Sequence, residues 1–334
     1  MSTFTGNFNV GAKPVGILAR ALTGNIFVEQ NLAYMNEGDK DGYNVYKHDI
    51  QNTLVAWSAD PAAAATSTDQ AADYKRELTI LQSFEQFNPY DYHQYWREFQ
   101  PAGPFQWEGL PAEVQSNLEE LFLGTVAEAV EGALTAGDAI FTDGLVPQLL
   151  SSNYTTLDGA VADADAVVNN TAIAYRVASD NGNAAESEAL TSANIFTKLE
   201  LLIANQTKAM RKRPNRKFMM SHGTADLIRE AQRLELNFKG VDVTEAGIMR
   251  YAGYDMIENP SFPDDTLLFC SMSGDMKTDA IQLGTSQSSD FNNLEVERLS
   301  NFGRYWGMSL TFAIDIFVVR PEEICFYSTA ALDS

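Results

Sequence analysis

The sequence of 334 residues contains 23 basic and 45 acidic side chains, which gives a formal net charge of −22. This acidic balance argues against a nucleic acid or an anionic membrane as a specific partner, because phosphate binding needs clustered positive charge. The only cysteines, Cys270 and Cys325, do not make a disulfide framework. Met1–Val10 lacks the pattern of a signal peptide, and no apolar run is long enough to cross a bilayer. These features indicate a globular chain of about two domains in a reducing compartment.

Two long extended segments follow an irregular N-terminal region. Tyr43–Trp57 is rich in aromatic and β-branched residues, and Tyr74–Phe87 alternates in the same way. Between them, Ser58–Ala72 contains Pro61 and a run of alanines. The pattern predicts a β-hairpin whose arms of about 14 residues would each reach roughly 45 Å. Such a ribbon is only marginally stable alone and exposes its edges, so we expect it to lie on a neighbouring subunit.

A long amphipathic helix is expected over Pro111–Ala136. Proline suits its first turn, and Gly137 suits the position after its last turn. Apolar residues recur every three or four positions and predict one buried stripe. Its members are Val114, Leu118, Leu121, Phe122, Thr125, Val126, Ala129, Val130 and Ala133. Glu119, Glu120, Glu128 and Glu131 are expected largely off the stripe. A helix of about 39 Å needs something long to lie against.

The second half of the chain alternates between helices and strands. A turn is expected at Gly144–Leu149, and a helix over Ser192–Lys212, which Pro214 would stop. A short strand at Phe218–Ser221 would precede a helix capped by Thr224, with Leu227, Ile228, Ala231 and Leu234 on its buried side. From Val241 onward the pattern favours strands, ending in Tyr305–Arg320 and Ile324–Tyr327 with a turn at Pro321 between them.

No group of residues predicts catalysis or metal binding. Ser221, His222 and Asp226 are the ingredients of a hydrolase, but neighbouring strand residues point to opposite faces and no nucleophile elbow is present. His48 and His93 are the other histidines, and His93 sits among aromatic residues, which favours a packed, hydrogen-bonded side chain. Two acidic stretches lack the spacing of a calcium loop and are best explained as solvated loops. They are Asp163, Asp165 and Asn169, and Asp180, Asn181, Asn183 and Glu186. We therefore predict no catalytic, cofactor or metal site.

The one basic run is Arg211–Lys217. Cations at a helix C-terminus complement the helix dipole, which is the plainest interpretation. A contact with an acidic neighbouring subunit is the second, and nucleic-acid binding is the third. The sequence leaves all three open.

The order of these elements resembles the major capsid proteins of tailed bacteriophages. Tyr43–Phe87 is similar to the extended loop of that fold, Pro111–Ala136 to its spine helix, and Gly144–Leu149 to the exit from that helix. Lys217–Ser221 with the following helix resembles the strand and helix of its axial domain, and Gly303–Val319 with Pro321 resembles its closing strand. A lysine of the extended loop is cross-linked to a neighbour in some relatives. Lys47 and Lys75 lie in that region, but a simpler explanation is that they are charges that protect exposed strand edges from unwanted pairing.

The resemblance implies an α+β tailed-phage major capsid protein fold. Its parts would be an N-terminal arm (1–40), an extended loop (41–90), a peripheral domain (91–150 and 290–334) with a spine helix at 111–136, and an axial domain (151–289). It implies a structural virion protein without catalytic residues. Copies would assemble in the host cytoplasm into pentamers and hexamers of an icosahedral capsid around double-stranded DNA, without sequence-specific DNA binding. Separate scaffold, portal and decoration proteins would be its partners.

Two alternatives remain at this point. An encapsulin nanocompartment has the same fold, and a neighbouring cargo gene or shells without portal and DNA would favour it. A soluble hydrolase or binding protein would instead be a monomer with a concave polar pocket.

Overall fold

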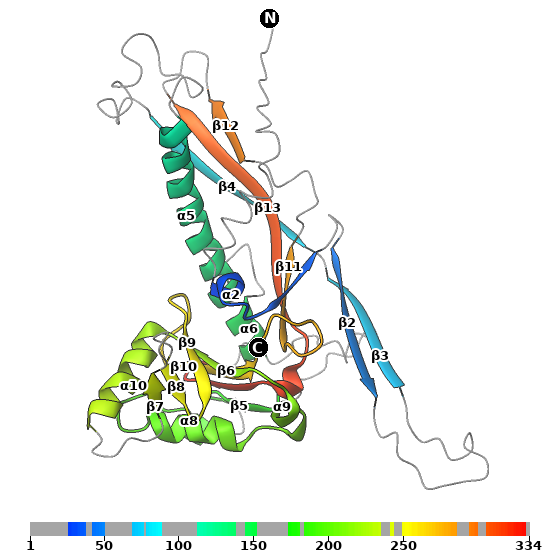
Figure 1. Ribbon diagram of the computed structural model, residues 1–334, viewed down its shortest axis with the longest axis vertical. Coiled ribbons are helices and arrows are strands. Elements are labelled where there is room, and N and C mark those ends of the chain that lie inside the picture. Colours follow the sequence, from blue (N-terminus) through cyan, green and yellow to red (C-terminus); the bar gives the residue numbers. More distant parts are fainter. Residues whose placement is uncertain are drawn as a thin grey trace, which may run out of the picture.

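The computed structural model describes residues 26–37, 42–50, 69–76, 78–88, 112–137, 144–151, 173–180, 184–234, 241–243, 249–285, 294–299 and 305–331. These residues form an elongated molecule with three parts (Figure 1). A five-stranded sheet runs beside one long helix, a seven-stranded sheet with helices forms the other end, and a two-stranded ribbon projects from the side. The mixture of separate helices and mainly antiparallel sheets confirms the expected α+β class.

Strand β13 (Trp306–Val318) organises the five-stranded sheet. β4 (Thr79–Phe87) pairs antiparallel along one edge of β13. β12 (Leu294–Arg298) and β11 (Ile281–Thr285) pair antiparallel with the two halves of the other edge, and β1 (Tyr34–Glu37) joins β11 in parallel. Alternate residues of β13 enter the core: Met308, Leu310, Phe312, Ile314 and Ile316.

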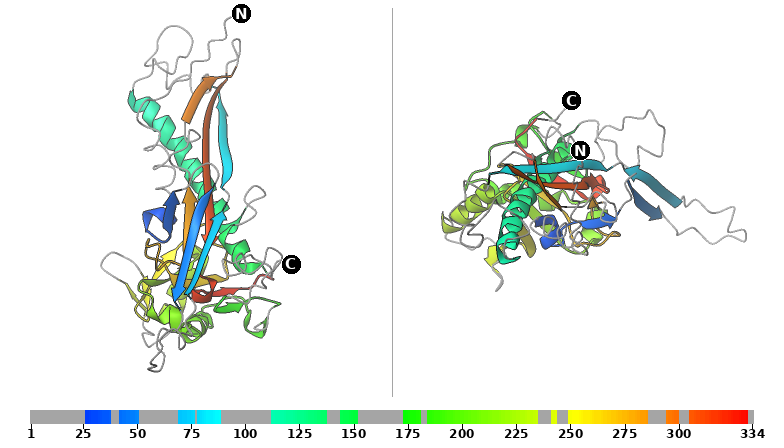
Figure 2. Two further views of the ribbon diagram at one scale, coloured as in Figure 1. Left: turned by 90° about the vertical axis from the view of Figure 1, so that its right-hand side faces the viewer. Right: turned by 90° about the horizontal axis from the view of Figure 1, so that it is seen from above.

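The expected spine helix is confirmed as α5 (Ala112–Ala136), which lies alongside this sheet (Figures 1 and 2). Its 25 residues span about 37 Å at the helical rise. The helix ends at Gly137, whose φ is +75° and whose N–H donates to the Ala133 carbonyl at 3.0 Å. Glycine is the residue that takes this left-handed cap without strain, as the sequence predicts.

The buried stripe of α5 differs from the expected one. Phe122, Leu123, Val126, Val130 and Leu134 join the core that contains the inward side of β13. In contrast, Leu121 keeps 71% of its surface exposed, so the prediction that it packs inward is wrong. Positions 121, 125 and 129 lie on the flank of the apolar arc, beyond the reach of the sheet. Glu131, expected on the polar side, is only 6% exposed.

The second sheet has the strand order β5-β14-β10-β6-β9-β8-β7. The strands are β5 (Tyr175–Val177), β6 (Arg216–Met220), β7 (Val241–Val243), β8 (Met249–Tyr251), β9 (Tyr254–Glu258), β10 (Thr266–Ser271) and β14 (Cys325–Ser328). Helices α8 (Ile195–Ala204) and α10 (His222–Leu234) contribute Ile195, Leu199 and Ile228 to its core. Phe218 of β6 stacks on Phe269 of β10, with ring centroids 4.2 Å apart. The expected mainly strand character after Val241 is confirmed.

Two helix predictions need correction. The expected helix at Ser192–Lys212 is two helices, α8 and the short α9 (Lys208–Lys212), because Thr207 begins a new helix by accepting a hydrogen bond from the Met210 N–H. The next helix is capped by Ser221 and not by Thr224, since the Ser221 Oγ accepts from the Thr224 N–H at 3.1 Å. Leu234 at the end of α10 is 68% exposed, although the sequence predicts it to be buried.

The expected hairpin also pairs differently. β2 (Tyr43–Ile50) pairs with β3 (Asp69–Arg76), so the predicted strand Tyr74–Phe87 is divided. Its second part is β4, which leaves the ribbon and pairs with β13 instead. The residues expected as a tip, 58–72, include the start of β3, and residues 51–68 lie outside the described part. β13 and β14 likewise join different sheets and form no hairpin.

The joint between the two sheets is a short buried helix where the sequence predicts a turn. This helix, α6 (Leu145–Leu150), is held by Gln148, whose side chain donates to the Ile316 carbonyl at 2.7 Å and accepts from the Val318 N–H at 3.3 Å. Arg176 of β5 donates to the Leu149 and Ser151 carbonyls, both at 3.2 Å. α6 therefore connects β13 to the seven-stranded sheet.

The sheets divide the chain differently from the expected domain ranges. β11 belongs to the five-stranded sheet although it falls within 151–289, and β14 belongs to the seven-stranded sheet although it falls within 290–334. The difference arises because both crossings use backbone pairing between distant segments, which no local pattern reports. Residues 1–25 of the expected N-terminal arm lie outside the described residues.

We predict that Leu134→Ala destabilises the subunit and Leu121→Ala does not. Leu134 is fully buried, so its truncation should lower the free energy of unfolding by about 2–5 kcal/mol. Leu121 is exposed, and its truncation should stay within about 0.5 kcal/mol. Urea unfolding of unassembled subunits, followed by circular dichroism, measures both. Equal losses for the two variants would contradict the orientation of α5.

Candidate assembly surfaces

The β2–β3 ribbon is a separate two-stranded sheet. Its strands pair antiparallel from Tyr43↔Arg76 to Ile50↔Asp69. Figures 1 and 2 show it extending away from both larger sheets, so that only its base adjoins the rest of the molecule. Two strands alone bury little apolar area and are marginally stable in water. The ribbon thus offers a long surface that the rest of the described chain does not cover.

The base of the ribbon is fixed to the five-stranded sheet by Tyr43. Its hydroxyl donates to the Oδ2 atom of buried Asp315 at 2.9 Å, and its ring packs with Val45, Phe317 and Val319. The ring also lies against Gly284 of β11, where a Cβ atom would overlap it. This close approach explains a glycine in the middle of a strand. The direction of the ribbon is therefore set by a contact with β11 and β13.

A second candidate surface is the face of the five-stranded sheet directed away from α5. Ile80 and Phe84 of β4 are 50% and 54% exposed, and Leu299 and Tyr305 near β12 and β13 are also exposed. Phe84 and Leu299 both lie over Gly307, which leaves room for them. We call Ile80, Phe84, Leu299 and Tyr305 the outer sheet face. Large apolar side chains gathered on a surface are a signature of interaction sites.

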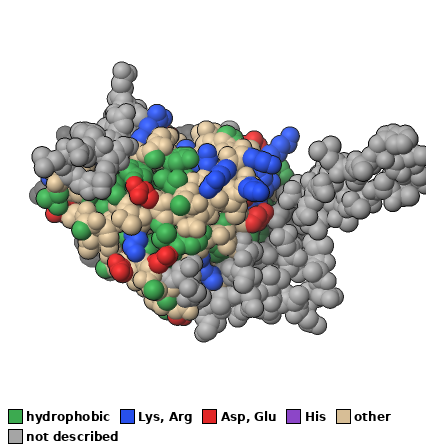
Figure 3. Space-filling model, turned by 90° about the horizontal axis from the view of Figure 1, so that it is seen from below, with side chains coloured by type: hydrophobic (Ala, Val, Ile, Leu, Met, Phe, Trp, Pro, Cys, Tyr) green, Lys and Arg blue, Asp and Glu red, His purple; other side chains and the backbone are tan. Residues whose placement is uncertain are grey.

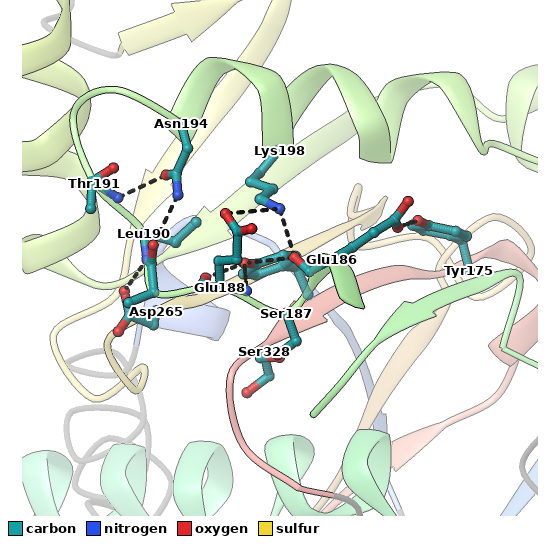
Figure 4. A network of polar contacts seen from close by, with 12 residues as sticks. Tyr175, Glu186, Ser187, Glu188, Leu190, Thr191, Asn194, Lys198, Asp265 and Ser328 are labelled. Carbon is teal, nitrogen blue, oxygen red and sulfur yellow. Dashed lines mark hydrogen bonds and ion pairs between the residues drawn. The ribbon is translucent and has the colours of Figure 1, made fainter. Parts of the chain in front are cut away.

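We call the seven-stranded sheet with its helices the lower unit, after its place in Figure 1. It contains a network of polar contacts around the 184–194 loop (Figure 4). Lys198 donates from Nζ to the Glu186 carbonyl at 2.6 Å, the Leu190 N–H donates to Asp265 at 2.8 Å, and the Tyr175 hydroxyl donates to the Glu186 carboxylate. Burial raises the pKa of Tyr327, whose hydroxyl donates to the Glu188 carbonyl, to about 12. These bonds tie the loop to β5, α8 and β14, and they use the polar groups for structure.

The residues that suggested a hydrolase are not assembled into a triad. Ser221 Oγ donates to Asp264 at 2.6 Å, His222 Nδ1 lies 2.8 Å from Glu258, and Asp226 accepts from Arg229 at 2.6 Å. Each side chain thus has a different partner, and a nucleophile needs its base within hydrogen-bond reach.

The basic run is used partly within the chain. Arg213 makes a bidentate contact with buried Glu323, with a shortest distance of 2.7 Å. Arg216 donates to Gln206 and lies over the Tyr254 ring, and Arg211 donates to the Ala204 carbonyl at 3.1 Å. Lys212 is exposed at the end of α9. The interpretation as cations at a helix C-terminus therefore accounts for only part of the run.

The remaining candidates give no site in the described part of the chain. No group of three or more His, Cys, Asp or Glu side chains there is placed to hold a metal ion. Asp163, Asp165, Asn169, Asn181, Asn183 and His93 lie outside the described residues, as do the side chains of Lys47, His48 and Lys75. Cys270 and Cys325 are free and buried, and burial raises the pKa of Cys325 to about 12. No described helix is long and apolar enough to cross a membrane.

One buried polar group that the sequence misses is the carboxylate of Glu131. Its Oε2 atom accepts from the Ile26 N–H of α2 (Ile26–Glu29) at 3.4 Å, and its Oε1 atom has no hydrogen-bond partner in the described structure. Burial raises the pKa of Glu131, and the hydrogen bond from Ile26 offsets part of that effect. No local feature of the sequence predicts that Glu131 is buried, because its burial depends on where α2 packs against the helix.

Known proteins resemble this chain in structure but not in sequence. No protein-family model and no curated protein sequence matches the chain. Among solved structures, the capsid of an empty GTA particle is similar with a TM-score of 0.57 at 14% identity, over 90% of this chain and 96% of that one. The procapsid of satellite phage P4 gives 0.54 at 9% identity, over 96% and 91%.

The chain has the fold of tailed-phage major capsid proteins. This confirms the fold that the order of elements suggested. The holo-SrpI encapsulin of Synechococcus elongatus PCC 7942 is also similar, with a TM-score of 0.50 at 13% identity over 93% of this chain and 90% of that one. At these identities the likeness concerns the fold alone. These structural neighbours are shells and not enzymes.

We predict that Tyr43→Phe loosens the base of the ribbon. The change keeps the ring but leaves the buried Asp315 carboxylate without this donor, which should cost about 1–3 kcal/mol. Amide hydrogen exchange in β2 and β3 should accelerate, whereas Tyr305→Phe, at an exposed tyrosine, should leave it unchanged. Unchanged exchange in both variants would contradict the anchoring role.

We predict that Glu131→Gln stabilises the subunit at neutral pH. A carboxyl whose pKa is raised by folding contributes less stability as pH rises above its unfolded value of 4.5, because the folded state then has to hold a proton or bury a charge. The variant should therefore be more stable than the native chain at pH 7.5, and the difference should shrink toward pH 4.5. Glu230→Gln, at an exposed glutamate of α10 that has no part in the pKa shift of Glu131, is the control and should show no such pH dependence. A constant difference at all pH values would refute this explanation.

Proposed function

We propose that this chain is a structural shell subunit, the major capsid protein of a tailed bacteriophage. The observation that carries the proposal is the β2–β3 ribbon, which projects from a capsid-type fold and contacts its own subunit only at the base. A ribbon of this kind gains stability by lying on another copy. Its function is then to join subunits.

The exposed apolar residues support the same proposal. The outer sheet face and Leu121 of α5 leave large apolar side chains in water on one isolated subunit. Burying them between copies removes apolar area from water, at about 25 cal/mol per Å². Extended arms and apolar faces together provide interfaces of the large, obligate kind. Such interfaces commonly bury about 2,000 Å² or more of accessible surface, counted over both partners.

In the proposed assembly, subunits form pentamers and hexamers of an icosahedral capsid that encloses double-stranded DNA. Assembly takes place in the host cytoplasm, with scaffold, portal and decoration proteins as separate partners and no membrane. The net charge of −22 suits such a container, because an acidic lining repels phosphates and leaves the genome mobile. The chain itself acts by shape and contact, without a catalytic residue.

An encapsulin-type nanocompartment is the second candidate. The similarity to the SrpI encapsulin supports it, since both kinds of shell use this fold. The two proposals differ in content: a capsid takes up DNA through a portal, whereas a nanocompartment encloses a protein cargo. Particles purified from the native source distinguish them by nuclease-protected DNA or by a co-purifying protein.

The proposal predicts that the ribbon is required for assembly and not for folding. Replacing residues 46–74 with a short Gly-Ser linker removes most of the ribbon and retains Tyr43 and Val45 at its base. The variant should keep its circular dichroism and cooperative melting and should form no closed particles in negative-stain electron microscopy. The native chain, expressed in parallel, is the control and should form them. Normal particles from the shortened chain would refute the proposed role of the ribbon.

A further inference from the structure

The surface of α9 carries cations that are not neutralised within the described chain. Lys208, Arg211 and Lys212 are exposed on this helix, and Lys277 is exposed beside it, since Arg213 donates to the Lys277 carbonyl at 3.3 Å. We call these four residues the α9 patch. No carboxylate oxygen of the described residues lies within 4.0 Å of any of them, whereas Arg213 is paired with Glu323. In a chain with about twice as many acids as bases, this is a local concentration of positive charge that attracts an acidic surface.

The patch lies on one side of the lower unit, at its edge in the broad view of the molecule. Figure 1 looks down the shortest axis and places α9 at the right of the lower unit. Figure 3 looks at that unit from below, and basic side chains gather on its right-hand part. If elongated subunits lie flat in a shell, their broad faces point inward and outward and their edges meet neighbouring subunits. The position therefore favours another subunit over packaged DNA as the occupant.

A complementary surface lies on the other side of the same unit. α10 is at the left of the lower unit in Figure 1, and its outward row carries Asp226 and Glu230 one turn apart. Asp226 is paired with Arg229, whereas Glu230 has no basic partner within 4.0 Å in the described chain. The row continues to Leu234, which is 68% exposed. We call Asp226 and Glu230 the α10 acidic row.

Head-to-tail rings bring one side of each subunit against the opposite side of the next. We propose that the α9 patch of one copy docks on the α10 acidic row of the adjacent copy around each ring. The inference rests on the proposed shell function. It names the contact that sets the orientation of each subunit relative to the next one in the ring. Charge complementarity of this kind fixes register and suppresses wrong pairings more than it adds affinity.

Charge reversal on the two sides tests the contact. Lys208→Glu with Lys212→Glu should reduce the yield of particles by about tenfold or more, because five or six like-charged contacts in a ring each oppose closure. Asp226→Lys with Glu230→Lys should do the same. The chain with all four changes restores opposite charges at every contact and should assemble again. Particle yield is measured by sedimentation and negative-stain microscopy.

The matched control is Arg233→Glu on the exposed end of α10. It shifts the net charge as much as Lys212→Glu does, but it makes the α10 side more acidic. Lys212→Glu should therefore impair assembly and Arg233→Glu should not. Since these side chains are exposed, each variant should melt within a few degrees of the native subunit. Should a reversed variant melt much lower, Lys208→Gln with Lys212→Gln replaces it, and this neutral pair should lower particle yield and make assembly less sensitive to salt.

Three results would overturn the proposal. Normal yield from the Lys208 and Lys212 reversal would show that the patch is not an interface. Loss that the fourfold variant fails to restore would show that α10 is not its partner. Strong binding of duplex DNA by native subunits, with a salt slope of about −4 that the reversal removes, would assign the patch to phosphates. Native chains that form no shells refute the proposed function itself, so the two failures are distinguishable.

Discussion

The structure depends on the backbone pairing of β13. Along one edge it binds β4, and along the other it binds β12 and then β11. Beyond the end of β4, the Gln148 side chain takes the Ile316 carbonyl and the Val318 N–H, so this part of the edge is also used. Asp315 of the same strand holds Tyr43 at the ribbon base. One strand therefore sets the position of the long helix, the joint to the second sheet and the direction of the ribbon, because buried backbone groups need partners.

This arrangement produces a subunit that is well packed inside and incompletely covered outside. The two sheets have dense cores, with fully buried residues such as Phe218, Phe269 and Phe317. The ribbon and the outer sheet face are left to water in an isolated subunit. The buried cores hold each subunit in its fold. The exposed apolar surfaces are not needed for those cores and are available for contacts with neighbouring subunits.

Charge adds order to contacts whose stability comes from apolar burial. Most of the acidic excess is dispersed, whereas the α9 cations are concentrated on one helix of five residues. An extended arm can bury apolar area on a neighbouring subunit in several alternative alignments. A local pairing of unlike charges favours one of these alignments. The buried Glu131 accepts a hydrogen bond from the Ile26 N–H, which links the start of the described chain to the spine helix.

The sequence by itself determined the elements whose signals are local. The length of α5, its glycine cap, the strands after Val241 and the order of elements follow from periodicity and turn residues, and that order was enough to indicate the capsid fold. Only the tertiary structure decided which strands pair. Tyr74–Phe87 reads as one strand, but its halves join β2 and β13 because pairing partners lie far away in the sequence. It also decided which side of α5 is buried, leaving Leu121 in water and Glu131 inside, since an apolar arc can be wider than the sheet that covers it. The surfaces that we propose for assembly belong to this second class, because they are what remains uncovered after the long-range pairings are made.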